Sequence, residues 1–73
     1  MDSLLLFSST HFVLKTEKEL KRKGFDCRVI PTPRRFSSDC DIAVLVKNTE
    51  PVHIGKILNA KKFGVEAVHE FAS

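Results

Sequence analysis

The amino-acid sequence predicts an α+β fold whose elements follow the order β-α-β-β-α-β. Two short uninterrupted apolar runs, at residues 4–7 and 42–46, are typical of buried strands. Two segments with helical periodicity are each followed by a glycine, the residue that commonly ends a helix. The chain of 73 residues has the size of one domain, so residues 1–73 are expected to share a single core.

The first half of the chain predicts a strand, a helix and a second strand. The first apolar run is the first strand, and Ser9 or Thr10 is expected to cap a helix at residues 11–23. Gly24 follows as the helix stop. Apolar and polar side chains then alternate over residues 25–30, which predicts a half-buried strand.

The second half predicts a strand, a helix and a final strand. The second apolar run is the third strand, and Asn48 or Thr49 is expected to cap the helix that follows. Pro51 falls in the first turn of that helix, where a missing N–H costs nothing. The helix is expected to end at Gly64, and residues 65–71 form a last strand of mixed polarity.

This order is that of the ferredoxin-like split βαβ arrangement, with two helices on one face of a four-stranded antiparallel sheet. Its first and third strands are central, which suits the two uninterrupted apolar runs. No helix covers the other face, so apolar residues of 4–7 and 42–46 must be exposed there or buried against a partner. We therefore expect a homodimer or a heteromeric contact through this open sheet face.

The formal charge of +3 and the pI of about 9.1 indicate a mild basic excess, well short of a dedicated nucleic-acid surface. Much of it lies in residues 18–23, interleaved with glutamates. A solvated helix face is the simpler interpretation of this run, and an RNA or phosphate surface is the alternative. The strands lack aromatic residues at the positions used by RNA-binding sheets, so nucleic acid is not an expected partner.

Neither a membrane span nor a secretory signal is expected. The apolar runs are far shorter than the roughly 20 residues that a span needs. Residues 1–7 lack the basic start of a signal peptide. The cytoplasm is the expected location, and Cys27 and Cys40 are expected to be reduced thiols there.

The connection at residues 31–41 is the main candidate for a functional site. It exceeds the roughly 2–5 residues of a usual hairpin loop, and two prolines stiffen it. Its polar side chains accompany one thiol: Arg34, Arg35, Ser37, Ser38 and Cys40. Positive charge and hydroxyl donors favour a nucleophilic thiolate, whereas Asp39 and Asp41 oppose one. A reactive thiol is the leading interpretation, and a buried inert thiol is the alternative.

Two further residues have two interpretations each. Cys27 is expected in the core as a small hydrophobic residue, with a resolving partner for Cys40 as the alternative. Glu17 falls on or beside the apolar stripe of the first helix. It is either a solvated carboxylate at the edge of that stripe or an acid that pairs with Arg28 or a loop arginine and orients the loop.

The histidines and cysteines do not predict a metal site. The histidines are dispersed over three elements, at His11, His53 and His69, where surface positions are expected. No Cys/His spacing of a structural zinc site occurs in the sequence. Neither a metal nor another cofactor is expected.

Several short stretches together resemble a known family. They are Phe-Ser-Ser-Thr-His at residues 7–11, Glu17, Ile-Pro-Thr-Pro-Arg at 30–34 and Ser-Ser-Asp-Cys at 37–40. In this order, over nearly the whole chain, they resemble the small bacterial and archaeal family described as putative selenium/sulfur (Se/S) carrier protein-like. The resemblance implies a carrier thiol at Cys40, supported by Pro33, Arg34, Ser37, Ser38 and Glu17. The chain departs from the family pattern at Asp41, where glycine is usual, and this aspartate adds negative charge beside the sulfur.

Two functions from different classes follow. In the first, Cys40 accepts sulfur or selenium from a donor protein and passes it to an acceptor, while Arg34 and Ser38 stabilise the anion and Phe36 excludes water. In the second, the domain is a non-catalytic interaction or regulatory module that dimerises through its sheet face. A stand-alone enzyme is not favoured, because the sequence has no general acid–base pair, phosphate-binding loop or metal cluster.

Overall fold

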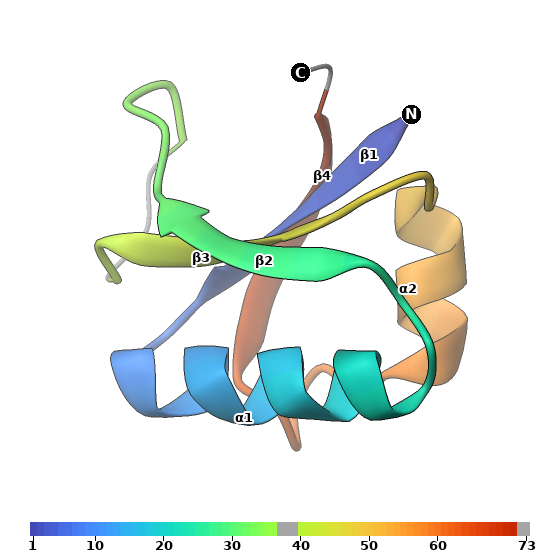
Figure 1. Ribbon diagram of the computed structural model, residues 1–73. Coiled ribbons are helices and arrows are strands. Elements are labelled where there is room, and N and C mark those ends of the chain that lie inside the picture. The colour runs from blue at the N-terminus through green and yellow to red at the C-terminus, as the bar shows by residue number, and fades with distance from the viewer. Residues whose placement is uncertain (37–39, 72–73) are drawn as a thin grey trace.

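The four strands form one antiparallel sheet in the order β2-β3-β1-β4, seen in a computed structural model that describes residues 1–36 and 40–71 (Figure 1). The elements are β1 (Asp2–Phe7), α1 (Thr10–Arg22), β2 (Cys27–Pro31), β3 (Ile42–Val46), α2 (Pro51–Ile57) and β4 (Val65–Phe71). The predicted order of elements and the ferredoxin-like α+β fold are therefore confirmed. The first and third strands are central, as their uninterrupted apolar sequences predicted.

The end of α1 explains why β2 begins two residues later than predicted. The N–H groups of Gly24 and Phe25 donate to the carbonyls of Lys21 and Leu20, both at 3.0 Å, which is the Schellman pattern. Gly24 has φ +93°, so it is the glycine stop that the sequence predicted. Phe25 belongs to this cap, and β2 therefore starts at Cys27.

The predicted bounds of the second helix were wrong at both ends. Its N-cap is Glu50, because the Thr49 hydroxyl donates instead to the Lys47 carbonyl at 3.1 Å. The helix ends at Ile57, well before Gly64. The side chain of Asn59 accepts a hydrogen bond from the Lys62 N–H at 3.2 Å, and such local bonding starts a turn in place of a further helical turn.

Both helices pack on one face of the sheet and enclose the larger part of the core. α1 lies against β2 and β3, and α2 lies against β1 and β4. The side chains buried between the layers come from every strand but β4 and from both helices, with Val65 and Val68 of β4 packed at the edge. On α1 the buried stripe is Val13, Thr16 and Leu20, at helical spacing.

The opposite face of the sheet is covered by the chain itself, contrary to the expectation of exposed central-strand residues. Leu4, Leu6 and Ala43 are at most 2% exposed. Ile30, Phe36, Ala67 and Phe71 pack over them, and Phe36 comes from the connection that rises on the side away from α1 (Figure 1). Phe36 of the long connection thus covers part of this face. Dimerisation stays a prediction, which sedimentation at high micromolar concentration can test.

No helix in the described part of the chain is long and apolar enough to cross a membrane.

Removing the hydroxyl of Thr16 should stabilise the domain. Its Oγ1 atom is fully buried and has no hydrogen-bond partner among the described residues. Thr16→Val keeps the shape and removes the desolvated group, so we expect about 1 kcal/mol of added stability and a melting temperature about 4–8 °C higher. Thermal unfolding followed by circular dichroism measures this.

Thr49→Val is the matched control. The Thr49 hydroxyl is also buried but donates to the Lys47 carbonyl, so Thr49→Val removes a hydrogen bond and should lower the melting temperature. A lower melting temperature for Thr16→Val as well would contradict the assignment of Thr16 as an unsatisfied group.

Candidate functional site: a thiol at the start of the first helix

Cys40 is held at the end of the connection, two residues before β3 begins. Thr32 holds this end of the connection in place. Its N–H donates to the Asp41 carbonyl at 2.8 Å, and its hydroxyl donates to the Cys40 carbonyl at 3.0 Å. These two bonds close the connection just beyond the paired residues Pro31 and Ile42. The Cys40 side chain is 4% exposed and packs into the core on the helix side of the sheet.

The sulfur of Cys40 lies beside the first residue of α1. The Thr10 Oγ1 atom is 3.5 Å from the Cys40 Sγ atom, within hydrogen-bonding reach. The first N–H groups of a helix have no partners within it and form the positive end of its dipole. This end favours negative charge and is a usual location of reactive cysteines. The Cys40 sulfur therefore lies at the positive end of α1, with the Thr10 hydroxyl within hydrogen-bonding reach.

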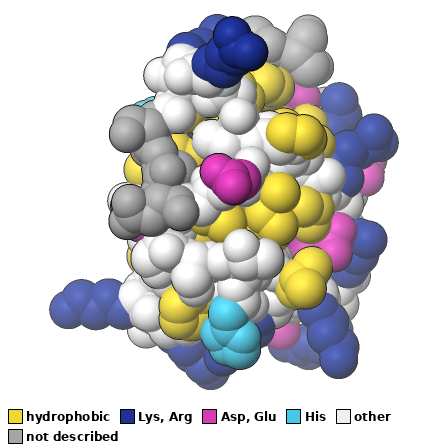
Figure 2. Space-filling view, turned by 90° about the vertical axis from the view of Figure 1, so that its left-hand side faces the viewer, with side chains coloured by type: hydrophobic (Ala, Val, Ile, Leu, Met, Phe, Trp, Pro, Cys, Tyr) yellow, Lys and Arg dark blue, Asp and Glu magenta, His cyan; other side chains and the backbone are white. Residues whose placement is uncertain are grey.

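The antiparallel pairing of β1 and β3 brings these two residues together. Leu5 pairs with Val44, so the end of β1 lies beside the start of β3. The chain that leaves β1 enters α1 at Thr10, and the chain that enters β3 comes from Cys40. Figure 2 shows this end of the molecule, where hydrophobic side chains are exposed among backbone and polar atoms and basic side chains lie at the margins. An acidic side chain lies near the middle of the same view, and the side chain of Asp41, which follows Cys40 in the chain, is exposed.

Arg35 of the connection packs away from the thiol. Pro33 begins a turn in which its carbonyl accepts the Phe36 N–H at 3.0 Å, and Arg34 and Arg35 are the exposed central residues. The Arg35 guanidinium lies 5.0 Å from the centroid of the Phe36 ring and 5.3 Å from that of Phe71. Arg35 and Phe36 therefore act on the open sheet face, whereas Cys40 lies on the helix side.

This placement corrects one expected role. Phe36 shields the sheet from water and does not shield the thiol, because its ring packs against His69 at 4.7 Å and against Phe71 at 6.3 Å. Ser37 and Ser38, the two predicted hydroxyl donors, lie outside the described residues. Pro33 and Arg34 are in the turn that precedes them.

Glu17 belongs to the surroundings of the other cysteine. Its carboxylate pairs with Lys21 at 3.4 Å and is partly exposed, which fits the interpretation of a solvated carboxylate at the stripe edge rather than the alternative pairing with Arg28 or a loop arginine. Its backbone carbonyl accepts a hydrogen bond from the Cys27 Sγ atom at 3.7 Å. Thr10 and Glu17 are separated by seven residues of helix, about 10 Å along the axis. Glu17 therefore does not orient the part of the connection that holds Cys40.

The two thiols lie at opposite ends of the β2–β3 pair. Cys27 pairs with Val46, whereas Cys40 precedes Ile42, which pairs with Pro31. Cys27 and Pro31 are four residues apart on β2, so the two cysteines are separated by about 13 Å along the strands. Disulfide-bonded cysteines have Cα atoms within about 7 Å, so Cys27 is not placed to resolve Cys40. Cys27 is 5% exposed and packs in the core, which confirms the structural interpretation of this residue.

Asp41 causes no backbone strain in place of the glycine of the family pattern. Its side chain is exposed. Among the described residues only Asn48, Gly24 and Gly64 have a positive φ, so Asp41 has a conformation open to any residue.

Thr10 and Thr32 are the site residues that sequence analysis missed. The sequence indicates Thr10 as a possible helix cap and as part of the family-like stretch 7–11, but it assigns no contact with the thiol to Thr10 and no role to Thr32. The split βαβ topology could have indicated these residues, because it places the loop after the first strand beside the loop before the third strand. The three histidines are exposed, and no group of three potential metal ligands occurs among the residues that the structure describes.

The stability of the domain should fall at alkaline pH because of Cys27. Burial above all, and the nearby Glu17 carboxylate, raise the pKa of the Cys27 thiol. The neutral thiol therefore stabilises the fold fully below the unfolded-state pKa of about 8.5–9, and this stabilisation is lost as the pH rises through the folded-state pKa. Urea unfolding of the reduced protein at pH 7.5 and at pH 10 measures the loss.

Cys27→Ser is the control, since it keeps a hydrogen-bond donor near the Glu17 carbonyl but does not titrate in this range. An equal loss of stability in wild type and Cys27→Ser would show that Cys27 is not responsible.

Neither the search of curated proteins nor the search of solved structures found a match to this chain. A family model described as "putative Se/S carrier protein-like" matches residues 2–70. This range includes Thr10, Thr32 and Cys40 and covers nearly all of the fold, and the chain therefore belongs to the putative Se/S carrier protein-like family.

Proposed function

We propose that this domain carries sulfur or selenium on Cys40, between a donor protein and an acceptor protein. The observation that carries the proposal is the position of the Cys40 sulfur, 3.5 Å from the Thr10 hydroxyl at the start of α1. A carrier must hold a persulfide or selenosulfide anion long enough to deliver it. The helix end and the hydroxyl together favour such an anion. Membership of a family described as a putative Se/S carrier supports the same role.

The transfer exchanges one sulfur–sulfur bond for another. The Cys40 thiolate attacks the terminal sulfur of a donor persulfide and forms a new S–S bond. The donor's own S–S bond breaks, and the donor sulfur leaves as a thiolate with the electron pair. The terminal sulfur keeps its proton or releases it to water, and no external oxidant or reductant is needed. An acceptor thiolate repeats the step on the Cys40 persulfide, and a reducing compartment such as the cytoplasm keeps the thiols available.

The burial of Cys40 adds a gate to this chemistry. At 4% exposure the sulfur is protected between turnovers, and local opening must precede attack. The two Thr32 bonds to the Cys40 and Asp41 backbone and the contact of the sulfur with Thr10 oppose such opening. A persulfide that is exposed only during such openings would react with small thiols more slowly than an open one, but would still react.

The loading experiment tests the proposed function. The protein is incubated with a cysteine desulfurase and cysteine, and intact masses are recorded. Wild type and Cys27→Ser should gain the mass of one sulfur atom, and Cys40→Ser should gain none. Thr10→Val removes the hydroxyl beside the sulfur and should lower the yield of persulfide about threefold to tenfold, while Ser8→Ala, at a neighbouring exposed position, should not.

A second outcome would support the other function. Should wild type and Cys40→Ser gain equal mass, or neither gain any, Cys40 is a structural thiol. The domain would then be an interaction module, and Cys40→Ser would leave its partner binding intact.

Loosening the connection should expose the thiol. Thr32→Val removes the hydroxyl that donates to the Cys40 carbonyl but keeps the backbone bond to Asp41. We expect alkylation of Cys40 by iodoacetamide to become about twofold to tenfold faster, which corresponds to the loss of one hydrogen bond in the closed state. The rate is measured by mass spectrometry in a Cys27→Ser background. An unchanged rate would mean that Thr32 does not hold the closed conformation.

A further inference from the structure

A basic groove lies on the outer side of α1, beyond the residues that form the thiol site. Its volume is about 260 Å³, and it is open between the helix and the turn before β4. Four cations, one carboxylate and one aromatic ring line it: Lys15, Lys18, Arg22, Lys62, Glu19 and Phe63. Lys15, Lys18 and Arg22 share one face of α1, because they are spaced by three and four residues.

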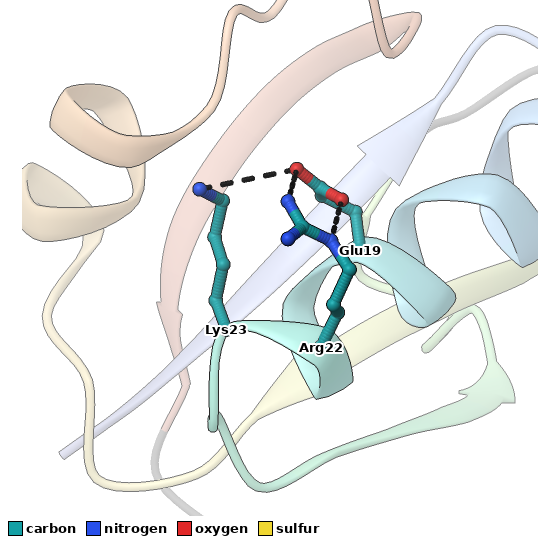
Figure 3. Close-up of polar contacts among 3 residues, drawn as sticks. All are labelled: Glu19, Arg22 and Lys23. Atoms are coloured by element: carbon teal, nitrogen blue, oxygen red, sulfur yellow. Dashed lines mark hydrogen bonds and ion pairs between the residues drawn. The ribbon is translucent and has the colours of Figure 1, made fainter.

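The single carboxylate of the groove is already neutralised from within the same helix. Both oxygens of Glu19 accept hydrogen bonds from Arg22 at 2.9 Å, and the Lys23 ammonium lies 3.9 Å away (Figure 3). The bonds from Arg22 hold the pKa of Glu19 below its usual range, so this carboxylate stays ionised and bound to the guanidinium at neutral pH. Glu19 balances one of the four cationic charges of the groove, so a net positive excess is left to attract an outside anion.

Phe63 fixes the positions of two of these lysines. The Lys15 and Lys62 ammonium groups lie 5.6 and 5.8 Å from the centroid of its ring, within the range of a cation–π contact. The ring itself is 7% exposed. A nucleic-acid base would need an open aromatic face on which to stack, so the groove suits a carboxylate-bearing partner better than a single-stranded nucleic acid.

We propose that this groove, with the neighbouring Leu14, docks an acidic surface of the protein that exchanges sulfur with Cys40. That the partner exchanges sulfur with Cys40 rests on the proposed function, whereas the binding of an acidic surface in the groove does not. Leu14 is 59% exposed, so an apolar anchor stands beside the charges. Thr10 contacts the sulfur, and Lys15 follows five residues later, about 7.5 Å along the helix. An interface of about 800 Å² per side spans both.

A peptide experiment tests the docking surface without any sulfur transfer. Hexaglutamate is titrated into ¹⁵N-labelled protein at low salt, with a neutral glycine-serine hexapeptide as the blank. The amides of Lys15, Lys18, Lys62 and Phe63 should shift to saturation. Lys18→Glu should weaken the binding at least about fivefold, whereas Lys56→Glu, the same change at an exposed position of α2, should weaken it less than twofold.

Three outcomes would overturn the proposal. The shifts could spread evenly over all lysines, or Lys56→Glu could weaken binding as much as Lys18→Glu. An RNA hexanucleotide could shift the groove amides at a lower concentration than the peptide, which would make the surface a nucleic-acid site. Inorganic phosphate could saturate the groove as tightly as the peptide, which would make it a small-anion site.

A loading comparison then separates the docking surface from the carrier chemistry. Glutathione persulfide, a small donor, should load wild type, Lys18→Glu and Lys56→Glu at equal rates. Loading by the desulfurase at limiting concentration should slow at least about threefold in Lys18→Glu alone. No loading of any variant by the small donor would contradict the carrier function and leave the peptide result standing. Equal enzymatic rates in all variants would show that the groove does not serve the transfer partner.

Discussion

The pairing of β1 with β3 is the constraint on which the rest of the structure depends. These two strands are buried on both faces, and their register places the end of one beside the start of the other. The start of α1 and the end of the long connection therefore meet at one edge of the molecule. The contact between Thr10 and Cys40 is a direct consequence. A slip of one residue in this register would move every side chain of the strand to the other face and would separate the two groups.

The sheet divides the connection between its two faces. Arg35 and Phe36 pack on the face that has no helix, where they cover the central strands, while Cys40 enters the core on the helix side. The same segment thus completes the fold on one face and presents the thiol on the other. This arrangement explains why a domain of 73 residues has so long a hairpin connection.

The two cysteines differ in their electrostatic surroundings, although both are buried. Cys27 lies beside the Glu17 carboxylate and the second half of α1, and burial raises the pKa of its thiol. Cys40 lies at the opposite, positive end of the same helix. One helix therefore gives each thiol a different environment. Its outward side carries the basic groove, so a partner bound there would lie close to the thiol at the start of the helix.

The sequence by itself determined the order of the elements, the central place of the two apolar strands and the choice of Cys40 as the candidate thiol. The order of the elements and the central strands follow from local patterns, namely apolar runs, helical spacing and glycine stops. Cys40 is indicated by its place in an unusually long connection that also contains prolines, arginines and serines. Tertiary structure alone decided that Arg35 and Phe36 serve the sheet face, that Glu17 accompanies Cys27, and that Thr10 and Thr32 position Cys40. Some of these contacts join residues that are far apart in the sequence. Others involve residues close in the sequence, such as Phe36 and Cys40, whose side chains pack on opposite faces of the sheet. They depend on strand register and on the path of the connection, which local patterns do not specify.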